Sequence, residues 1–232
     1  MHRTVAAAVI AGLVALTPAS GQANLLTNPG FETGNLSGWT TSGDVAAYAC
    51  EYAASGCPAG FGDWIATLNN YTLGVGNASL TQAVVVPGAG TYEFGAMIAY
   101  ATILPTGGNF ASGQISLTVQ GEGISETIGF DPNALGDAQF TIGPNAAGFS
   151  WTEWFELTGT LTYGGAGPAS FLININIQNA TENARLALDV DNVFIRAAAV
   201  PEPASIALFG VALLGLGFLM RRGAYAANGS TA

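Results

Sequence analysis

Hydrophobic and polar residues alternate along much of the middle of the chain. In the segment 171–178 the odd positions are apolar, and Asn174 and Asn176 are among the polar even positions. A period of two is typical of a β-strand with one buried face and one face in water. The same alternation predicts half-buried strands in three more segments: 92–98, 114–120 and 155–163.

Shorter apolar runs between turn residues predict further strands. Pro87-Gly88 and Gly164-Gly165 are examples of the glycine and proline pairs that separate the runs. Eight to ten strands at this spacing are typical of one all-β sandwich domain, over residues 24–199. The further strands are expected at 25–27, 44–49, 64–68, 79–86, 125–130 and 184–196.

The first 23 residues have the pattern of a secretory signal peptide. Arg3 precedes an uncharged apolar run over 5–16, and Pro18 breaks the helix. Gly21 and Ala23 are the small residues that a cleavage site needs at its −3 and −1 positions. We expect cleavage after Ala23. The alternative is an uncleaved anchor or a buried helix.

A second uncharged apolar segment covers residues 204–220 and is followed at once by Arg221 and Arg222. As a helix it would be about 25 Å long, enough for one short transmembrane helix. The arginine pair belongs on the cytoplasmic side by the positive-inside rule. The domain between the two ends is therefore expected outside the cytoplasmic membrane.

Pro201, Glu202 and Pro203 lie directly before that helix. Two prolines make this segment extended, exposed and unable to join the helix. The order of Pro-Glu-Pro, short membrane helix and arginine pair, over residues 200–223, resembles the PEP-CTERM sorting signal, and residues 224–232 form a short tail. The resemblance implies an exosortase as the processing partner and a Gram-negative host. The chain would be anchored in the inner membrane as a precursor, then released to the envelope or outside.

The charged residues of the chain exclude several further classes of function. The chain has 5 basic and 15 acidic residues and a net charge of −10. Such a balance argues against nucleic acid as a partner. The one histidine, His2, lies in the leader, and the chain has no lysine. Imidazole-based catalysis, histidine-ligated zinc and Schiff-base chemistry are therefore not expected of the mature domain.

The edges of the middle domain carry a second resemblance. The opening NLLTNPGFETGNLSGW, residues 24–39, looks like the start of jelly-roll carbohydrate-binding modules. LDVDNVFI, residues 188–195, looks like their last strand, and WFELTGTLT, residues 154–162, fits a strand that precedes it. The resemblance implies a jelly-roll β-sandwich.

In modules of this kind the first and last strands meet, and a structural calcium often lies between them. The matching positions are the backbone carbonyl of Gly30 and the carboxylates of Glu32 and Asp191, with Asp63 as a further carboxylate. Calcium prefers six to eight oxygen ligands. The resemblance therefore implies a calcium cofactor. The alternative is that these carboxylates accept backbone hydrogen bonds at strand ends.

Cys50 and Cys57 are the two cysteines of the chain. In an oxidising compartment they are expected to pair. The alternative is a redox or metal-binding pair, although the spacing is not that of a thioredoxin motif.

Aromatic rings are suitable platforms for sugars. Trp39 and Trp64 are expected in the core, whereas Trp154 is the best candidate for an exposed, ligand-binding ring. Glu153 and Glu156 flank Trp154, but in one continuous strand they would point to opposite sides. They would then not form the carboxylate pair that a glycosidase needs.

These observations together predict an exported, non-enzymatic protein of the envelope or extracellular matrix, associated with exopolysaccharide or biofilm. The alternative is a carbohydrate-binding module that holds polysaccharide through aromatic and Asn/Gln groups on one sheet face. A glycoside hydrolase is a remote alternative.

Overall fold

The computed structural model of the 232-residue chain describes residues 23–53, 55–69, 76–103, 113–130, 140–142, 149–179 and 186–198. The chain divides into two units, Met1–Ala198 and Ala199–Ala232, and the described residues belong to the first. The leader before Ala23, the predicted membrane helix and the sorting signal lie outside them. Within these ranges no helix is long and apolar enough to span a membrane.

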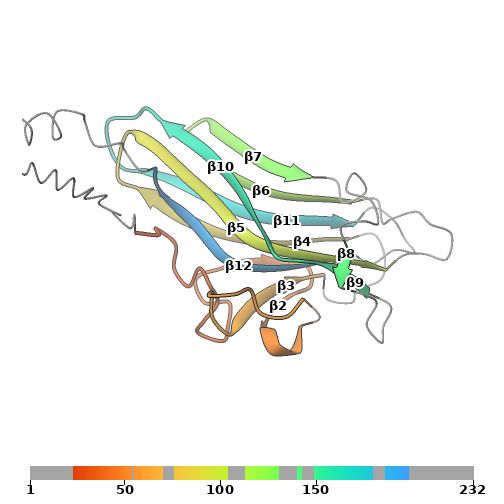
Figure 1. Ribbon diagram of the computed structural model, residues 1–232. Helices are drawn as coiled ribbons and strands as arrows, with labels where there is room; N and C mark the ends of the chain where they lie inside the picture. The colour runs from red at the N-terminus through yellow and green to blue at the C-terminus, as the bar shows by residue number, and fades with distance from the viewer. Residues whose placement is uncertain are drawn as a thin grey trace, which may run out of the picture. The chain divides into compact units, whose positions relative to one another are not determined.

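Two antiparallel sheets make up the domain, and a single short 3-10 helix, η1 (Cys50–Tyr52), interrupts the described strands. The all-β jelly-roll sandwich predicted from the sequence is thus confirmed. In Figure 1 the long strands β4, β11 and β6 lie side by side, and so do β5 and β12. The five-stranded sheet has the order β1 (Thr40–Ser42), β4 (Gly76–Val86), β11 (Ala169–Asn179), β6 (Gly113–Gly121) and β7 (Ile124–Phe130). The seven-stranded sheet has the order β2 (Val45–Ala49), β3 (Trp64–Leu68), β12 (Leu186–Ala197), β5 (Gly90–Ile103), β9 (Phe149–Thr152) and β8 (Phe140–Ile142), with β10 (Phe155–Tyr163) also paired to β5.

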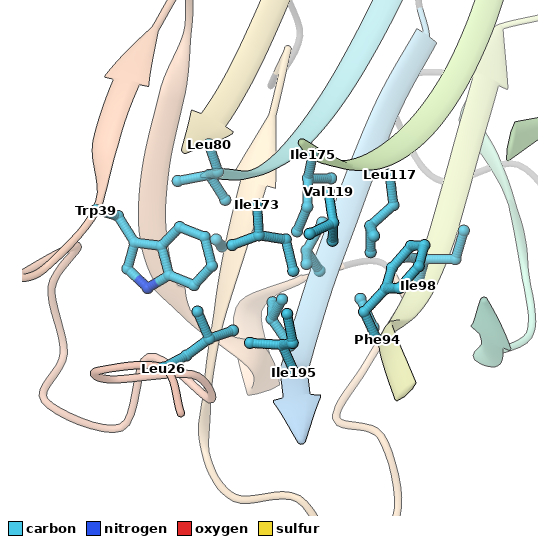
Figure 2. Packing of buried hydrophobic residues seen from close by; sticks show 14 of the residues in the cluster. Leu26, Trp39, Leu80, Phe94, Ile98, Leu117, Val119, Ile173, Ile175 and Ile195 are labelled. Atoms are coloured by element: carbon cyan, nitrogen blue, oxygen red, sulfur yellow. The ribbon is translucent and has the colours of Figure 1, made fainter. Parts of the chain in front are cut away.

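The core lies between the sheets and is built from the apolar half of each alternating strand. Figure 2 shows Ile173 and Ile175 of β11 packed with residues that include Phe94 of β5 and Ile195 of β12. Trp39 is 8% exposed and belongs to this cluster. Its expected place in the core is therefore confirmed. Trp64 is half-buried and packs against the cluster.

The predicted strand at 25–27 is wrong. That segment has no strand conformation. At Thr27 a side chain supplies the hydrogen bonds that a neighbouring strand would supply. The Gln82 amide accepts a bond from the Thr27 N–H at 2.7 Å and donates one to the Thr27 carbonyl at 2.9 Å. The sequence pattern also missed the three short strands β1, β8 and β9.

The opening segment nevertheless lies against the last strand, as the family resemblance implied. The Leu25 N–H donates to the Ile195 carbonyl at 2.9 Å, and the Val193 N–H donates to the Pro29 carbonyl at 2.9 Å. The Asn24 side-chain amide donates to the Val193 carbonyl at 2.7 Å. These bonds fix the 30–32 turn beside a bulge in β12 between Asp191 and Phe194.

Candidate functional sites

Two carboxylates meet where the opening segment reaches the bulge in β12. Asp191 is fully buried, and its Oδ1 accepts a bond from the Asn192 N–H. Its Oδ2 is buried with no hydrogen-bond partner among the described residues. Glu32 accepts bonds at 3.1 Å from the backbone N–H groups of Asp63 and Trp64. The orphaned Asp191 oxygen is the unusual feature, because buried polar atoms normally have a partner.

Two glycines allow these groups to approach. A Cβ on Gly30 would lie 3.3 Å from the Asp191 Oδ1 and 3.7 Å from the Glu32 Cγ. A Cβ on Gly62, whose φ is +112°, would lie 2.3 Å from the Glu32 Cδ, which is too close for any side chain. The backbone at Gly30 and at Gly62 therefore lies close against the Glu32 side chain, which is itself exposed.

Of the four residues predicted as calcium ligands, the structure brings Gly30, Glu32 and Asp191 together. Asp63 is exposed and contributes its backbone N–H to Glu32. Within the described ranges no three acidic, histidine or cysteine side chains gather closely enough to hold a metal ion. A cation at this place would rely on two carboxylates and on carbonyl oxygens, a donor set that fits calcium.

A second buried carboxylate, Asp189, lies two residues earlier in β12 and anchors the loop between Cys50 and Cys57. It accepts hydrogen bonds from the Ser55 hydroxyl and, at 2.6 Å, from the Thr67 hydroxyl. The two cysteines form the predicted disulfide, with their Cα atoms 4.9 Å apart. The disulfide loop is thus attached to the sheet through Ser55.

Trp154 is a second contact of the same loop. Its indole N–H donates to the carbonyls of Ser55 and Gly56, each at 3.2 Å, and the ring is half-buried. The structure therefore gives this tryptophan a role in holding the loop, and its stacking on a sugar stays a prediction. Glu153 and Glu156 are both exposed, but β9 ends at Thr152 and β10 begins at Phe155, so the single strand assumed around Trp154 is wrong.

Burial changes the acidity of both aspartates. It raises the pKa of Asp189 to about 6, against the hydrogen bonds from Ser55 and Thr67 that lower it. Burial also raises the pKa of Asp191 to about 7, opposed by the Asn192 N–H and reinforced by the charge of Glu32. In both cases the protonated acid is favoured because the charged form is poorly solvated.

In calcium-free buffer we expect Asp189 to make the folded domain lose stability as the pH rises from about 4 to about 6, in addition to the loss that the raised pKa of Asp191 causes up to about pH 7. The folded Asp189 keeps a proton that the unfolded chain releases near pH 3.8, so its contribution is complete below that pH and is lost through its folded pKa. A rise of the pKa from 3.8 to about 6 corresponds to about 3 kcal/mol in the free energy of unfolding, or roughly 6–12 °C in the unfolding midpoint. Thermal melts of wild type and Asp189→Asn across this range measure it. An equally steep fall in Asp189→Asn would contradict the assignment.

A different surface lies on the side of the five-stranded sheet that points away from the core. Residues opposite one another in neighbouring strands share a face, so the register identifies its members. Among the described residues of these strands, none of the side chains on this face is charged. We call it the neutral face. It comprises Thr40, Ser42, Asn77, Ser79, Thr81, Ala83, Val85, Gln114, Ser116, Thr118, Gln120, Ser125, Thr127, Gly129, Ser170, Leu172, Asn174, Asn176 and Gln178.

The polar groups of the neutral face form rows across the strands. One row contains, in spatial order, Thr40, Thr81, Asn174, Thr118 and Thr127. At about 4.8 Å per strand it is about 19 Å long. Within it the Asn174 amide donates to the Thr81 hydroxyl at 2.6 Å, and the hydroxyls of Thr118 and Thr127 are 2.9 Å apart.

The next row contains Ser79, Asn176 and Ser116. The Asn176 Oδ1 is buried without a hydrogen-bond partner among the described residues. Beyond the rows, Leu172 and Val85 are 41% and 59% exposed. A hollow of about 460 Å³ lies beside Leu172, between Gln120, Ser125 and Ser170. The neutral face thus combines donors, acceptors and small apolar surfaces without charge.

Comparison with known proteins identifies the end of the chain. Residues 199–222 match the family described as the PEP-CTERM protein-sorting motif, which confirms the predicted sorting signal. The motif implies an exported protein that is anchored at the membrane before exosortase-dependent processing. A search of curated proteins found no match.

Solved structures similar to the chain include carbohydrate-binding modules. One is TmCBM61 in complex with beta-1,4-galactotriose, at 20% identity over 75% of this chain and 99% of that chain, with a TM-score of 0.47. Another is the CBM22-1 xylan-binding domain from Paenibacillus barcinonensis Xyn10C, at 18% identity over 78% and 97%, with a TM-score of 0.38. A third is a non-crystalline cellulose specific module, CBM28, at 14% identity over 75% and 96%, with a TM-score of 0.41.

Proposed function

We propose that this exported chain is a non-enzymatic protein of the cell envelope or extracellular matrix that binds neutral polysaccharide through its neutral face. The observation that carries the proposal is the uncharged neutral face, with one row of hydroxyl and amide groups across all five strands and a second row beside it. The whole chain has a net charge of −10, so a sheet face without a carboxylate is a distinct region of the surface.

The chemistry of the neutral face matches that of a neutral sugar. A sugar hydroxyl both donates and accepts hydrogen bonds, as Ser, Thr, Asn and Gln side chains do. Leu172 and Val85 offer apolar surface for the C–H face of a sugar ring. A row about 19 Å long accommodates several residues of an extended polysaccharide.

We expect Asn174→Ala combined with Gln120→Ala to weaken glycan binding about tenfold or more. Each lost hydrogen bond costs about 1 kcal/mol, and tenfold is about 1.4 kcal/mol. The full chain in mild detergent would be titrated with neutral hexasaccharides of β-linked glucans, xylan, galactan and mannan. Thr162→Ala, an exposed hydroxyl on the other sheet, is the matched control.

Two outcomes would contradict the proposal. If the folded wild-type chain binds none of these glycans, or if the double variant binds as wild type does, the neutral face is not a glycan site. Release of reducing sugar from any of the polysaccharides would contradict the non-enzymatic assignment.

We also propose that calcium binds between Glu32 and Asp191, with carbonyl oxygens of the 30–32 and 61–63 turns completing the site. A cation there would give the buried Asp191 Oδ2 a partner and stabilise the folded state by mass action. We expect millimolar calcium to raise the unfolding midpoint at pH 7 by several degrees, an effect that chelator reverses and Asp191→Asn abolishes. Glu51→Gln, at an exposed carboxylate, is the control. An unchanged midpoint in wild type would refute the site.

A further inference from the structure

A groove of about 390 Å³ lies on the seven-stranded sheet, on the side away from the core and thus on the opposite side of the sandwich from the neutral face. It crosses β10, β5 and β12 and is lined by Glu93, Glu156, Thr158, Thr160, Phe194 and Arg196. Arg196 is the single cation among the described residues, and it lies in this groove.

The floor of the groove contains a glycine of the central strand, β5. Gly95 of β5 lies between Thr158 of β10 and Phe194 of β12. A Cβ on Gly95 would be 2.6 Å from the Phe194 Cζ. The absence of a side chain at this position therefore lets the ring lie over the strand, and Phe194 is only 3% exposed.

Phe194 in turn orients Arg196. The guanidinium carbon lies 4.4 Å from the centre of the ring, a cation–π distance. The Arg196 Nε donates to the Glu93 Oε2 at 3.2 Å, and both side chains are 42% exposed. The guanidinium is thus held by two contacts, while much of its surface and of the carboxylate remains open to the groove.

The ion pair places hydrogen-bond donors directly beside acceptors. A guanidinium has five N–H donors and no acceptor, and a carboxylate has acceptors only. Adjacent hydroxyls of a sugar ring need both at once. The hydroxyls of Thr158 and Thr160 line the same groove. The two groups of the ion pair neutralise one another, so this end of the groove suits an uncharged diol.

We infer that this groove is a second glycan site, in which the Glu93–Arg196 pair binds the vicinal diol of a neutral sugar residue. This inference rests on the proposed function of the neutral face. Because the outer faces of the two sheets point in opposite directions, one molecule with both sites holds two polysaccharide chains. The protein then cross-links its matrix as a monomer.

Two measurements test the inference, calorimetric titration with the neutral hexasaccharides and the sedimentation of the corresponding polysaccharides mixed with the full chain. We expect two binding sites for each wild-type molecule and cross-linked, sedimenting polysaccharide. Glu93→Gln combined with Arg196→Gln removes both charges, leaves the net charge of the chain unchanged and keeps a polar side chain at each position. We expect this variant to retain one site and to lose cross-linking at least tenfold. Thr162→Ala is expected to behave as wild type.

The possible failures are distinguishable. A wild-type chain that binds one hexasaccharide without cross-linking overturns the second site and leaves the proposed function intact. Cross-linking by the Glu93/Arg196 variant at the wild-type level also overturns it, even if the chain binds glycan. Absence of binding by wild type refutes the proposed function itself. A melting curve for each variant confirms that the protein is folded.

Discussion

Replacement of Pro201, Glu202 and Pro203 by alanine is expected to leave the chain at full length in the membrane fraction. The two prolines lack backbone N–H groups and restrict the residues before them to extended conformations. Alanine has the highest helix propensity and removes both restrictions. We expect the predicted membrane helix to extend into residues 201–203, so that the exosortase no longer encounters an extended segment before the helix.

The measurement is the mass and location of the protein in its own host. Wild type is expected to lose the residues of the sorting signal, whereas the triple variant keeps Arg221 and Arg222. Asn228→Ala combined with Ser230→Ala, in the tail, provides a control of similar size. If the wild-type protein retains Arg222, the proposed processing does not take place. If the triple variant is processed normally, Pro-Glu-Pro is not required for processing.

The general architecture could be predicted because it depends on local patterns. The period of two in 171–178 places Ile173 and Ile175 in the core and Asn174 outside, as the structure shows. The disulfide could also be predicted from the sequence, since Cys50 and Cys57 are the two cysteines of the chain. The prediction of a strand at 25–27 failed because the Gln82 amide, which is distant in sequence, takes the place of a strand partner at Thr27.

The candidate sites depend on register, which the pattern of a single strand does not contain. Asn174 and Thr81 become neighbours only because β4 and β11 pair with a particular alignment. The buried Asp189 likewise resembles an ordinary polar position in a strand. Its partners Ser55 and Thr67 are 134 and 122 residues away, so no local signal marked it as the anchor of the disulfide loop.

Loss of the Cys50–Cys57 disulfide is expected to reduce the free energy of unfolding by about 3–6 kcal/mol. Closing a loop this short contributes roughly 2–3 kcal/mol through the entropy of the unfolded chain. The rest arises in the folded state. A loosened loop no longer holds Ser55 against Asp189, and a buried carboxylate that loses a hydrogen bond costs about 1–3 kcal/mol.

Denaturant melts of Cys50→Ser combined with Cys57→Ser, and of Ser55→Ala alone, separate these contributions. Ser55→Ala keeps the disulfide and removes the hydroxyl from Asp189, so it is expected to show only the second, smaller loss. Ser37→Ala, at an exposed serine, should change little. If the loop is attached to the sheet through Ser55, the triple variant loses less than the sum of the two separate effects, because the same contact is then counted only once. Strict additivity would mean that the loop stays in place without its disulfide, and that Trp154 rather than Asp189 is its main anchor.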